Sequence, residues 1–383
     1  MVLLQAPRDG SLLVRATYPR VESSCRRFRQ PVLEARYPGR IEVARADDGT
    51  MALTVTLDFE RYLEGIAEVP PSWPAAALEA QAIAARSYAL AHTGWDGEQG
   101  ETLDTPICAT DACQVYRGIA VEPVPDIERW YAAVRRTRGQ VLASEGRPIE
   151  AVYFSTSNGR VYGNDEVFGS APLPYLRPKI ERDDGASPTS RWQVRLPHGD
   201  LTRFLTAGGE WPQGVAIARV HQRGGEIVVA GRGQTRTMSV ATFRAAVNAW
   251  APCLMPGRYP GPSGGGGTLP LTVPSSWFAA SEAAGTFVLR GRGWGHGVGM
   301  VQWGAYGKAR AGWSAERILA HYYGGLEPQQ ATTPGLIHVL VAEGLRSVRT
   351  LPSGPGARLD GRPLGDGGVV IVGGARLSVA RDG

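Results

Sequence analysis

Lysine is almost missing from this chain, because only Lys179 and Lys308 occur among its 41 basic residues. The others are arginines, and the bias is typical of a GC-rich genome. They are dispersed, and no basic stripe alternates with aromatic residues, so the sequence does not favour a nucleic-acid surface. No run of eighteen apolar residues occurs, so we expect no membrane span within the chain. The N-terminus also lacks the charged and apolar regions of a signal peptide.

Several familiar catalytic and binding motifs are also absent. The glycine-rich segment 291–299 fits neither GxxxxGK[ST] nor GxGxxG, so it is not expected to be a phosphate loop. The chain has no GxSxG elbow, which disfavours a serine–histidine hydrolase drawn from the polar segment 155–158 and His296. No HExxH spacing occurs, so a metal site formed by His92, His296 and His321 is disfavoured as well.

Cysteine is scarce, but its even number suits two disulfides in an oxidising compartment. Cys108 and Cys113 are five residues apart and could close a small disulfide loop or supply two thiolates to a metal. No second pair follows at zinc-ribbon spacing, so Asp111 and a distant histidine would have to complete a zinc site. We therefore favour the disulfide, which leaves Cys25 with Cys253 as the remaining pairing.

The length of 383 residues predicts two or three domains or one large elaborated domain, at about 100–200 residues per domain. The patterns predict an α+β fold, with a mixed helical and β core, an inserted smaller α/β lobe and a β-rich C-terminal tail. We expect an irregular segment over 1–39, a catalytic domain over 40–325 with the lobe at about 190–285, and the tail over 326–383. The abrupt ends leave open a fragment of a longer protein with a truncated tail.

Two local patterns predict individual elements near the N-terminal third of the chain. Residues 40–59 mostly alternate between apolar and polar types, which predicts a β-hairpin, and Asp58 is then expected to cap a short helix. The clearest helix is predicted over 72–91, with Ser72 as the N-cap and Pro74 in the first turn.

Glu68 is the most distinctive chemical feature, because it lies among apolar residues and prolines in the segment 64–74. An apolar setting disfavours the charged form, so we expect its pKa to lie above the usual value of about 4.3. An acid that keeps its proton near neutral pH can donate it to a leaving group. The structural alternative is a helix-dipole partner near Ser72. His296, inside the glycine-rich segment, has the corresponding alternative of bonding nearby backbone.

Several sequence blocks are long enough to carry a family resemblance. They are Tyr62-Leu63-Glu64-Gly65, Glu68-Val69-Pro70, Ser72-Trp73-Pro74, Ala80-Gln81-Ala82-Ile83-Ala84-Ala85-Arg86-Ser87-Tyr88-Ala89, Cys113-Gln114-Val115-Tyr116-Arg117-Gly118, Pro174-Tyr175-Leu176 with Asp183-Asp184 and Trp192, and Trp294-Gly295-His296-Gly297-Val298-Gly299-Met300-Val301-Gln302-Trp303-Gly304-Ala305. In this order, across roughly residues 40–325, they resemble the stage II sporulation protein D (SpoIID/LytB amidase-enhancer) family of bacteria.

The resemblance implies a peptidoglycan lytic transglycosylase acting on glycan strands, often strands already stripped of stem peptides. The catalytic glutamate of the family's Glu-Met-Pro block matches Glu68, although Val69 replaces the methionine and the preceding segment is shorter than usual. Seven further side chains are expected to line the sugar groove. These are Gln81, Arg86, Tyr88, Ser155, Ser157, His296 and Gln302.

The resemblance also bears on cofactors, partners and location. Some members bind zinc through a Cys-x4-Cys segment with a histidine just before the second cysteine. Ala112 takes that position here, so no cofactor is expected and zinc at Cys108 and Cys113 is disfavoured. The expected partners are glycan strands and, by the family name, an amidase. We expect a location in the cell wall or secreted outside the cytoplasm, with membrane attachment only through a segment absent from this chain.

The number of carboxylates separates the candidate reactions. Hydrolytic glycosidases usually need two carboxylates that flank the bond, and no second acid is marked by a comparable motif. A lytic transglycosylase can use Glu68 alone and leaves a 1,6-anhydro end. The alternative is a non-catalytic cell-wall binding module or an activator of an N-acetylmuramoyl-L-alanine amidase.

Overall fold

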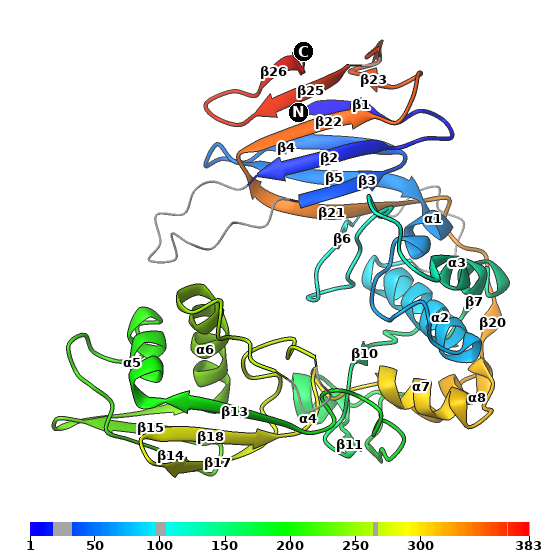
Figure 1. Ribbon diagram of the computed structural model, residues 1–383. Coiled ribbons are helices and arrows are strands. Elements are labelled where there is room, and N and C mark those ends of the chain that lie inside the picture. The colour runs from blue at the N-terminus through cyan, green and yellow to red at the C-terminus, as the bar shows by residue number, and fades with distance from the viewer. Residues whose placement is uncertain (18–32, 96–104, 263–266, 366, 383) are drawn as a thin grey trace.

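The computed structural model describes residues 1–17, 33–95, 105–262, 267–365 and 367–382. Two sheets form one end of the molecule, a helical layer follows, and a smaller lobe of helices and strands extends from the other end (Figure 1). This arrangement confirms the predicted α+β class.

The two sheets combine strands from both ends of the chain. The first has the order β24 (Arg362–Pro363), β23 (Arg358–Leu359), β1 (Val2–Gln5), β4 (Arg40–Arg45), β5 (Met51–Asp58), β21 (Leu336–Leu345) and β6 (Ile107–Cys108). The second has the order β26 (Ser378–Asp382), β25 (Gly368–Val372), β22 (Ser347–Pro352), β2 (Leu12–Thr17) and β3 (Leu33–Tyr37). Their buried side chains belong to one hydrophobic core, so the ends of the chain stabilise each other.

The structure differs from the expectation that residues 1–39 are irregular, because this segment contains β1, β2 and β3. Each strand is short, and its partners include strands that lie far away in the sequence. For example, β2 lies between β3 and β22, and Val14 pairs with Thr350. The tail over 326–383 is rich in strands as expected, but those strands complete the two sheets with β1, β2 and β5.

The predicted hairpin and the capped helix that follows it are both present. Strands β4 and β5 pair antiparallel, and helix α1 (Phe59–Glu64) begins directly after β5. The Asp58 carboxylate accepts a hydrogen bond from the backbone N–H of Arg61 at 2.9 Å. Because this bond satisfies a free donor of the first helical turn, it marks the start of α1.

The long helix α2 (Ala75–His92) begins after Pro74, so the expected N-cap at Ser72 is wrong. Ser72 lies inside a tight turn in which the N–H of Trp73 donates to the carbonyl of Pro70 at 3.1 Å. The helix is buried on nearly every side from residue 77 to residue 90. Its small side chains allow close packing by α3 (Ile127–Arg136), α7 (Gln302–Arg310) and α8 (Ala315–Tyr322).

Short strand pairs connect this helical layer to the lobe. They are β7 (Gln140–Val141) with β20 (Gln329–Gln330), β8 (Ala143–Ser144) with β9 (Arg147–Pro148), β10 (Tyr153–Phe154) with β19 (Met300–Val301), and β11 (Arg160–Val161) with β12 (Lys179–Ile180). Helix α4 (Asn164–Phe168) lies between β11 and β12 in the sequence. The parallel β10–β19 pair is central to the site, because it brings Tyr153 beside the start of α7.

The smaller lobe has its own hydrophobic core. Its elements are β13 (Trp192–Pro197), α5 (His198–Ala207), β14 (Arg219–Arg223), β15 (Glu226–Gly231), β16 (Gln234–Ser239), α6 (Val240–Leu254), β17 (Phe278–Ala283) and β18 (Thr286–Gly291). The lobe continues slightly beyond the expected end near 285, because β18 pairs with β13 as far as Gly291.

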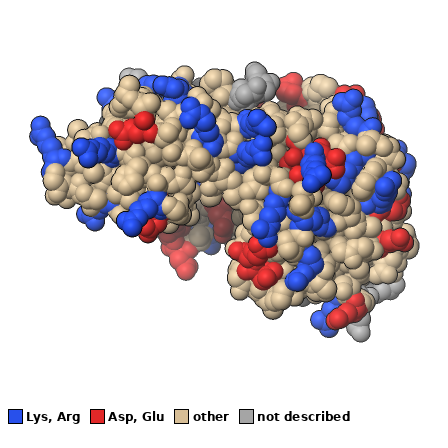
Figure 2. Space-filling view, turned by 90° about the horizontal axis from the view of Figure 1, so that it is seen from below, with Lys and Arg blue, Asp and Glu red and all other residues tan. Residues whose placement is uncertain are grey.

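Within the described ranges, no helix has both the length and the apolar character needed to cross a bilayer. Figure 2 shows that Lys and Arg side chains are spread over the face seen from below and alternate with Asp and Glu. Cys108 and Cys113 form the expected disulfide. The predicted Cys25–Cys253 pairing involves Cys25, which lies outside the described residues.

Candidate active site

Glu68 lies in the loop between α1 and α2, and this loop is held by the segment that follows the disulfide. The N–H of Ala67 donates to the carbonyl of Val115 at 2.9 Å. Gly65 allows the close approach, because a Cβ atom there would come within 2.3 Å of the Tyr116 ring. The position of Glu68 therefore depends on residues almost fifty positions away.

Three donors surround the Glu68 carboxylate. The N–H of Val115 donates to Glu68 Oε1 at 2.7 Å, and the side chains of Gln302 and Tyr153 also form hydrogen bonds to the carboxylate. Burial raises the pKa of Glu68, while these three donors oppose the rise. The predicted rise of the Glu68 pKa is confirmed. The alternative role of a helix-dipole partner near Ser72 is not observed, since the carboxylate faces these donors.

Gln114 orients the Tyr153 hydroxyl. The Tyr62 hydroxyl donates to Gln114 Oε1 at 2.8 Å, and Gln114 Nε2 donates to the Tyr153 oxygen at 2.9 Å. Because that oxygen already accepts a bond from Gln114, its own proton is available for Glu68. Burial raises the pKa of Tyr153 well above its usual value, so the phenol keeps this proton.

Gln302, which bonds to the carboxylate, also contacts Gln81. Gln302 Nε2 donates to Gln81 Oε1 at 3.4 Å, and Gln81 Nε2 is buried without a hydrogen-bond partner among the described residues. The start of α7 is held near the Glu68 loop by Trp73 and Trp303, whose ring centroids are 4.9 Å apart. Two of the predicted residues therefore lie together beside the acid.

Tyr88 is also close to Glu68, as the charge of the acid contributes to its raised pKa. Burial is the largest cause, and together with the charges of Glu150 and Glu68 it raises the pKa of Tyr88 to about 12. The ring stacks on His92 at 5.3 Å between centroids. Tyr88 is thus a neutral hydroxyl near the acid over the physiological pH range.

Asp111 is a second carboxylate whose charge reaches Glu68. It is exposed in the loop closed by Cys108 and Cys113, and its negative charge contributes to the raised pKa of Glu68. Sequence reasoning considered Asp111 only as a metal ligand. Its relation to Glu68 depends on the fold, since 43 residues separate the two positions along the chain.

His296 differs from the expectation that it lines the sugar groove. Its Nε2 atom donates to the carbonyl of Tyr153 at 2.9 Å, and its Nδ1 atom accepts from the N–H of Val298 at 3.2 Å. Both nitrogens are therefore engaged, and burial lowers the pKa of His296. The backbone-bonding alternative is the one observed, and a serine–histidine pair at this position is not formed.

The hydroxyl groups of Ser155 and Ser157 form hydrogen bonds to neighbouring residues of the same chain. The Ser155 hydroxyl lies 3.1 Å from that of Thr156 and is partly buried. Ser157 is buried, and its hydroxyl accepts from the N–H of Gly159 at 2.9 Å. The structure therefore differs from the expectation for Ser157, whose side chain supports the turn that follows it.

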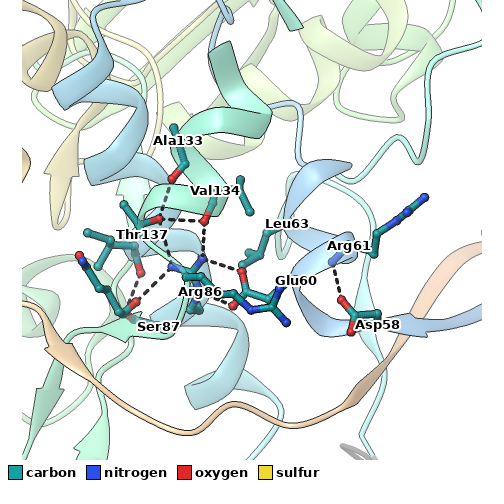
Figure 3. Close-up of polar contacts among 12 residues, drawn as sticks. Asp58, Glu60, Arg61, Leu63, Arg86, Ser87, Ala133, Val134 and Thr137 are labelled. Atoms are coloured by element: carbon teal, nitrogen blue, oxygen red, sulfur yellow. Dashed lines mark hydrogen bonds and ion pairs between the residues drawn. The ribbon is translucent and has the colours of Figure 1, made fainter. Parts of the chain in front are cut away.

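Arg86 is fully buried, which differs from its predicted place in the sugar groove. Its Nε and Nη2 atoms donate to the two carboxylate oxygens of Glu60 at 2.9 and 2.8 Å. Further bonds reach the carbonyls of Val134 and Gln140 at 3.4 and 3.1 Å. Figure 3 shows Arg86 between Glu60 and the end of α3, so its side chain joins α1, α2 and α3.

The structure thus gathers part of the predicted set around Glu68. Gln81, Tyr88 and Gln302 lie at the acid, whereas Arg86, Ser157 and His296 support the surrounding backbone. Sequence reasoning did not assign roles to Gln114, Val115 and Tyr153. The first two belong to the block 113–118 that carries the family resemblance, which is the signal that could have indicated them.

Comparisons with known proteins agree with the resemblance. Residues 47–143 match the model of the SpoIID family, described as stage II sporulation protein. The chain is 29% identical to a stage II sporulation protein D of Bacillus subtilis over 72% of this chain and 75% of the relative. It is 28% identical to an amidase enhancer of Bacillus subtilis over 67% of this chain but 38% of that longer protein. An uncharacterized protein of Brachyspira hyodysenteriae is 27% identical over 73% of this chain and 68% of its own length. The chain is thus similar to the SpoIID family, whose model matches residues 47–143.

Proposed function

We propose that this protein is a peptidoglycan lytic transglycosylase in which Glu68 acts as both acid and base. The names of its relatives, a sporulation protein and an amidase enhancer, support a cell-wall-related function. The observation that carries the proposal is a partly buried carboxylic acid with a raised pKa that three donors face. Such a group can hold a proton near neutral pH and can also exist as a stabilised anion.

The proposed reaction needs two proton transfers, one from Glu68 and one back to it. Protonated Glu68 donates to the glycosidic oxygen, the bond to the anomeric carbon breaks, and an alcohol leaves. The 6-hydroxyl of the same sugar then attacks the anomeric carbon and forms the anhydro ring. The Glu68 carboxylate removes the proton of that hydroxyl and returns to its acid form, so no water is consumed.

The neighbours of Glu68 suit both halves of this cycle. Burial favours the acid form before cleavage. After proton transfer, the Val115 N–H and the side chains of Tyr153 and Gln302 stabilise the negative charge. Charge-assisted hydrogen bonds of this kind are stronger than neutral ones, so they lower the energy of the intermediate state.

The test compares Glu68→Gln with Glu128→Gln on purified glycan strands. Glu128 lies on α3 with a mostly exposed side chain, so its substitution is a matched control for lost charge. We expect Glu68→Gln to reduce the rate by at least about a hundredfold, as removal of a general acid usually does. Mass spectrometry should find 1,6-anhydro ends with the wild type and the control. Full activity of Glu68→Gln would exclude the assignment, and reducing ends would indicate hydrolysis.

The second candidate is an activator of an N-acetylmuramoyl-L-alanine amidase, which the name of one relative supports. An activator would increase the rate of stem-peptide release by a purified amidase without shortening the glycan strand. Glu68→Gln should leave that stimulation intact, since the chemistry would belong to the amidase. Adding this variant to an amidase assay therefore separates the two functions.

A further inference from the structure

A groove lies on the smaller lobe, and Glu68 is not among its lining residues. It has a volume of about 1370 Å³ and is open to solvent along β13, β17 and β18. Five arginines line it, and none of the described lining residues is Asp or Glu. They are Arg191, Arg195, Arg258, Arg290 and Arg292. Arginines that are dispersed along the sequence are therefore close together at this groove.

Three of these arginines are free to bind a ligand. The side chains of Arg191, Arg195 and Arg292 are exposed and have no hydrogen-bond or ion-pair partner among the described residues. By contrast, Arg258 forms an ion pair with Asp200 at 2.8 Å, and Arg290 donates to Ser281 at 3.2 Å. Unpaired guanidinium groups that line one groove favour a ligand that carries oxyanions, because their planar donors match carboxylate geometry.

Side-chain contacts connect the groove with the candidate active site. Asn158 and Trp277 are among the residues that line the groove. Trp277 stacks on Tyr162 at 5.8 Å between centroids and contacts Phe154 edge to face at 6.5 Å. Phe154 directly follows Tyr153, which bonds to the acid. A series of contacts through Trp277, Phe154 and Tyr153 therefore links the arginine groove with the acid.

We propose that the arginine groove binds carboxylates of the peptidoglycan strand at positions beyond the bond that is cleaved. The inference rests on the proposed function, since it takes the occupant of the site to be a glycan strand. A peptidoglycan strand carries carboxylates at regular intervals. They belong either to the lactyl groups of its sugars or to its stem peptides, and both offer the same oxyanion chemistry. The groove thus retains the strand, while Glu68 cleaves it.

Binding is measured in the Glu68→Gln background, so that strand cleavage does not alter the ligand. Fluorescently labelled strands, with or without stem peptides, are titrated against this protein and against a version that also carries Arg191→Gln and Arg195→Gln. The matched control carries Arg223→Gln and Arg236→Gln. These two exposed arginines lie on β14 and β16 of the same lobe and do not line the groove.

We expect the groove variant to bind about three- to tenfold more weakly than the control at low salt, because exposed ion pairs are individually weak. The difference should nearly vanish in 1 M NaCl, where the screening length is about 3 Å. Esterifying the carboxylates should weaken binding to the unaltered groove by a similar factor. Loss with stripped strands assigns the lactyl carboxylates, and loss only with stem-bearing strands assigns the peptides.

Equal affinity of the groove variant and the control for both strands would overturn the proposal. Binding that survives esterification would overturn it too, as would an equal loss of affinity in the Arg223→Gln, Arg236→Gln control. Failure of the proposed function is a separate outcome. In that case the wild-type protein leaves no 1,6-anhydro ends on the strands, whereas the binding difference between groove variant and control needs no cleavage and is still measured.

Discussion

The backbone N–H of Val115 lies 2.7 Å from Glu68 Oε1 and donates a hydrogen bond to it. Val115 follows the disulfide between Cys108 and Cys113 by two residues. Gln114, between them, holds the Tyr153 hydroxyl that also bonds to the acid. The small disulfide loop is therefore connected directly to two of the three donors at the carboxylate.

Removing the disulfide between Cys108 and Cys113 should change both the free energy of unfolding and the pKa of Glu68. We expect Cys108→Ala with Cys113→Ala to lower the free energy of unfolding by about 2 kcal/mol, the value for so short a loop. A displaced Val115 would no longer favour the anion, so the pKa of Glu68 should rise further. Urea denaturation and the pH dependence of glycan cleavage measure the two effects. An unchanged pH profile would show that the loop keeps its position without the bond.

Tyr153→Phe should shift the pH dependence of glycan cleavage to higher pH. The hydroxyl lowers the pKa of Glu68, so its removal raises that pKa. In the proposed reaction the protonated acid is the active form, so activity should be lost as pH rises through this pKa, and the loss should occur at higher pH in the variant. The maximal rate should also fall, by about tenfold or more, because the anion loses a donor. A downward shift would contradict the assigned contact.

Asp111→Asn should shift the loss of glycan-cleaving activity at high pH toward lower pH. The charge of Asp111 raises the pKa of Glu68, so neutralising it lowers that pKa and activity is lost at lower pH. The shift should be a fraction of a pH unit at low salt, since Asp111 is exposed, and it should shrink as salt is added. A loss of more than about a hundredfold in rate would instead indicate that Asp111 takes part in hydrolysis.

Arg86→Ala should destabilise the fold by about 3–5 kcal/mol, because it leaves the Glu60 carboxylate without its partner in the protein interior. The matched control is Arg136→Ala, which removes an exposed partner of Glu79 and should cost less than about 1 kcal/mol. Urea denaturation of both variants gives the comparison. Similar losses in the two variants would show that the buried pair does not stabilise the helical layer.

Several features could be predicted because their causes are local. The hairpin β4–β5 follows from alternation, and the start of α1 follows from Asp58. The raised pKa of Glu68 was expected from its apolar neighbours, although the groups that face the carboxylate come from elsewhere in the chain. By contrast, β1 and β2 carried too little local signal, since long-range pairing with β4 and β22 completes them.

Arg86 and His296 show the limit of sequence reasoning most clearly. Both residue types are common in binding sites, and both belong to blocks that resemble the family. Whether such a side chain faces a ligand or the interior depends on what the fold places opposite it. Glu60 lies opposite Arg86, and the carbonyl of Tyr153 lies opposite His296. Each accepts a hydrogen bond from a nitrogen that burial would otherwise leave unpaired.

The sequence by itself indicated the resemblance to the SpoIID family, the α+β class and the apolar setting of Glu68, because ordered motifs and local patterns carry that information. Only the tertiary structure decided which side chains meet Glu68 and where the arginines gather. The donors come from the segment after the disulfide, from β10 and from the start of α7, and the groove arginines come from three separate segments. These contacts join residues that are far apart in the sequence. They depend on tertiary packing, which local sequence patterns do not predict.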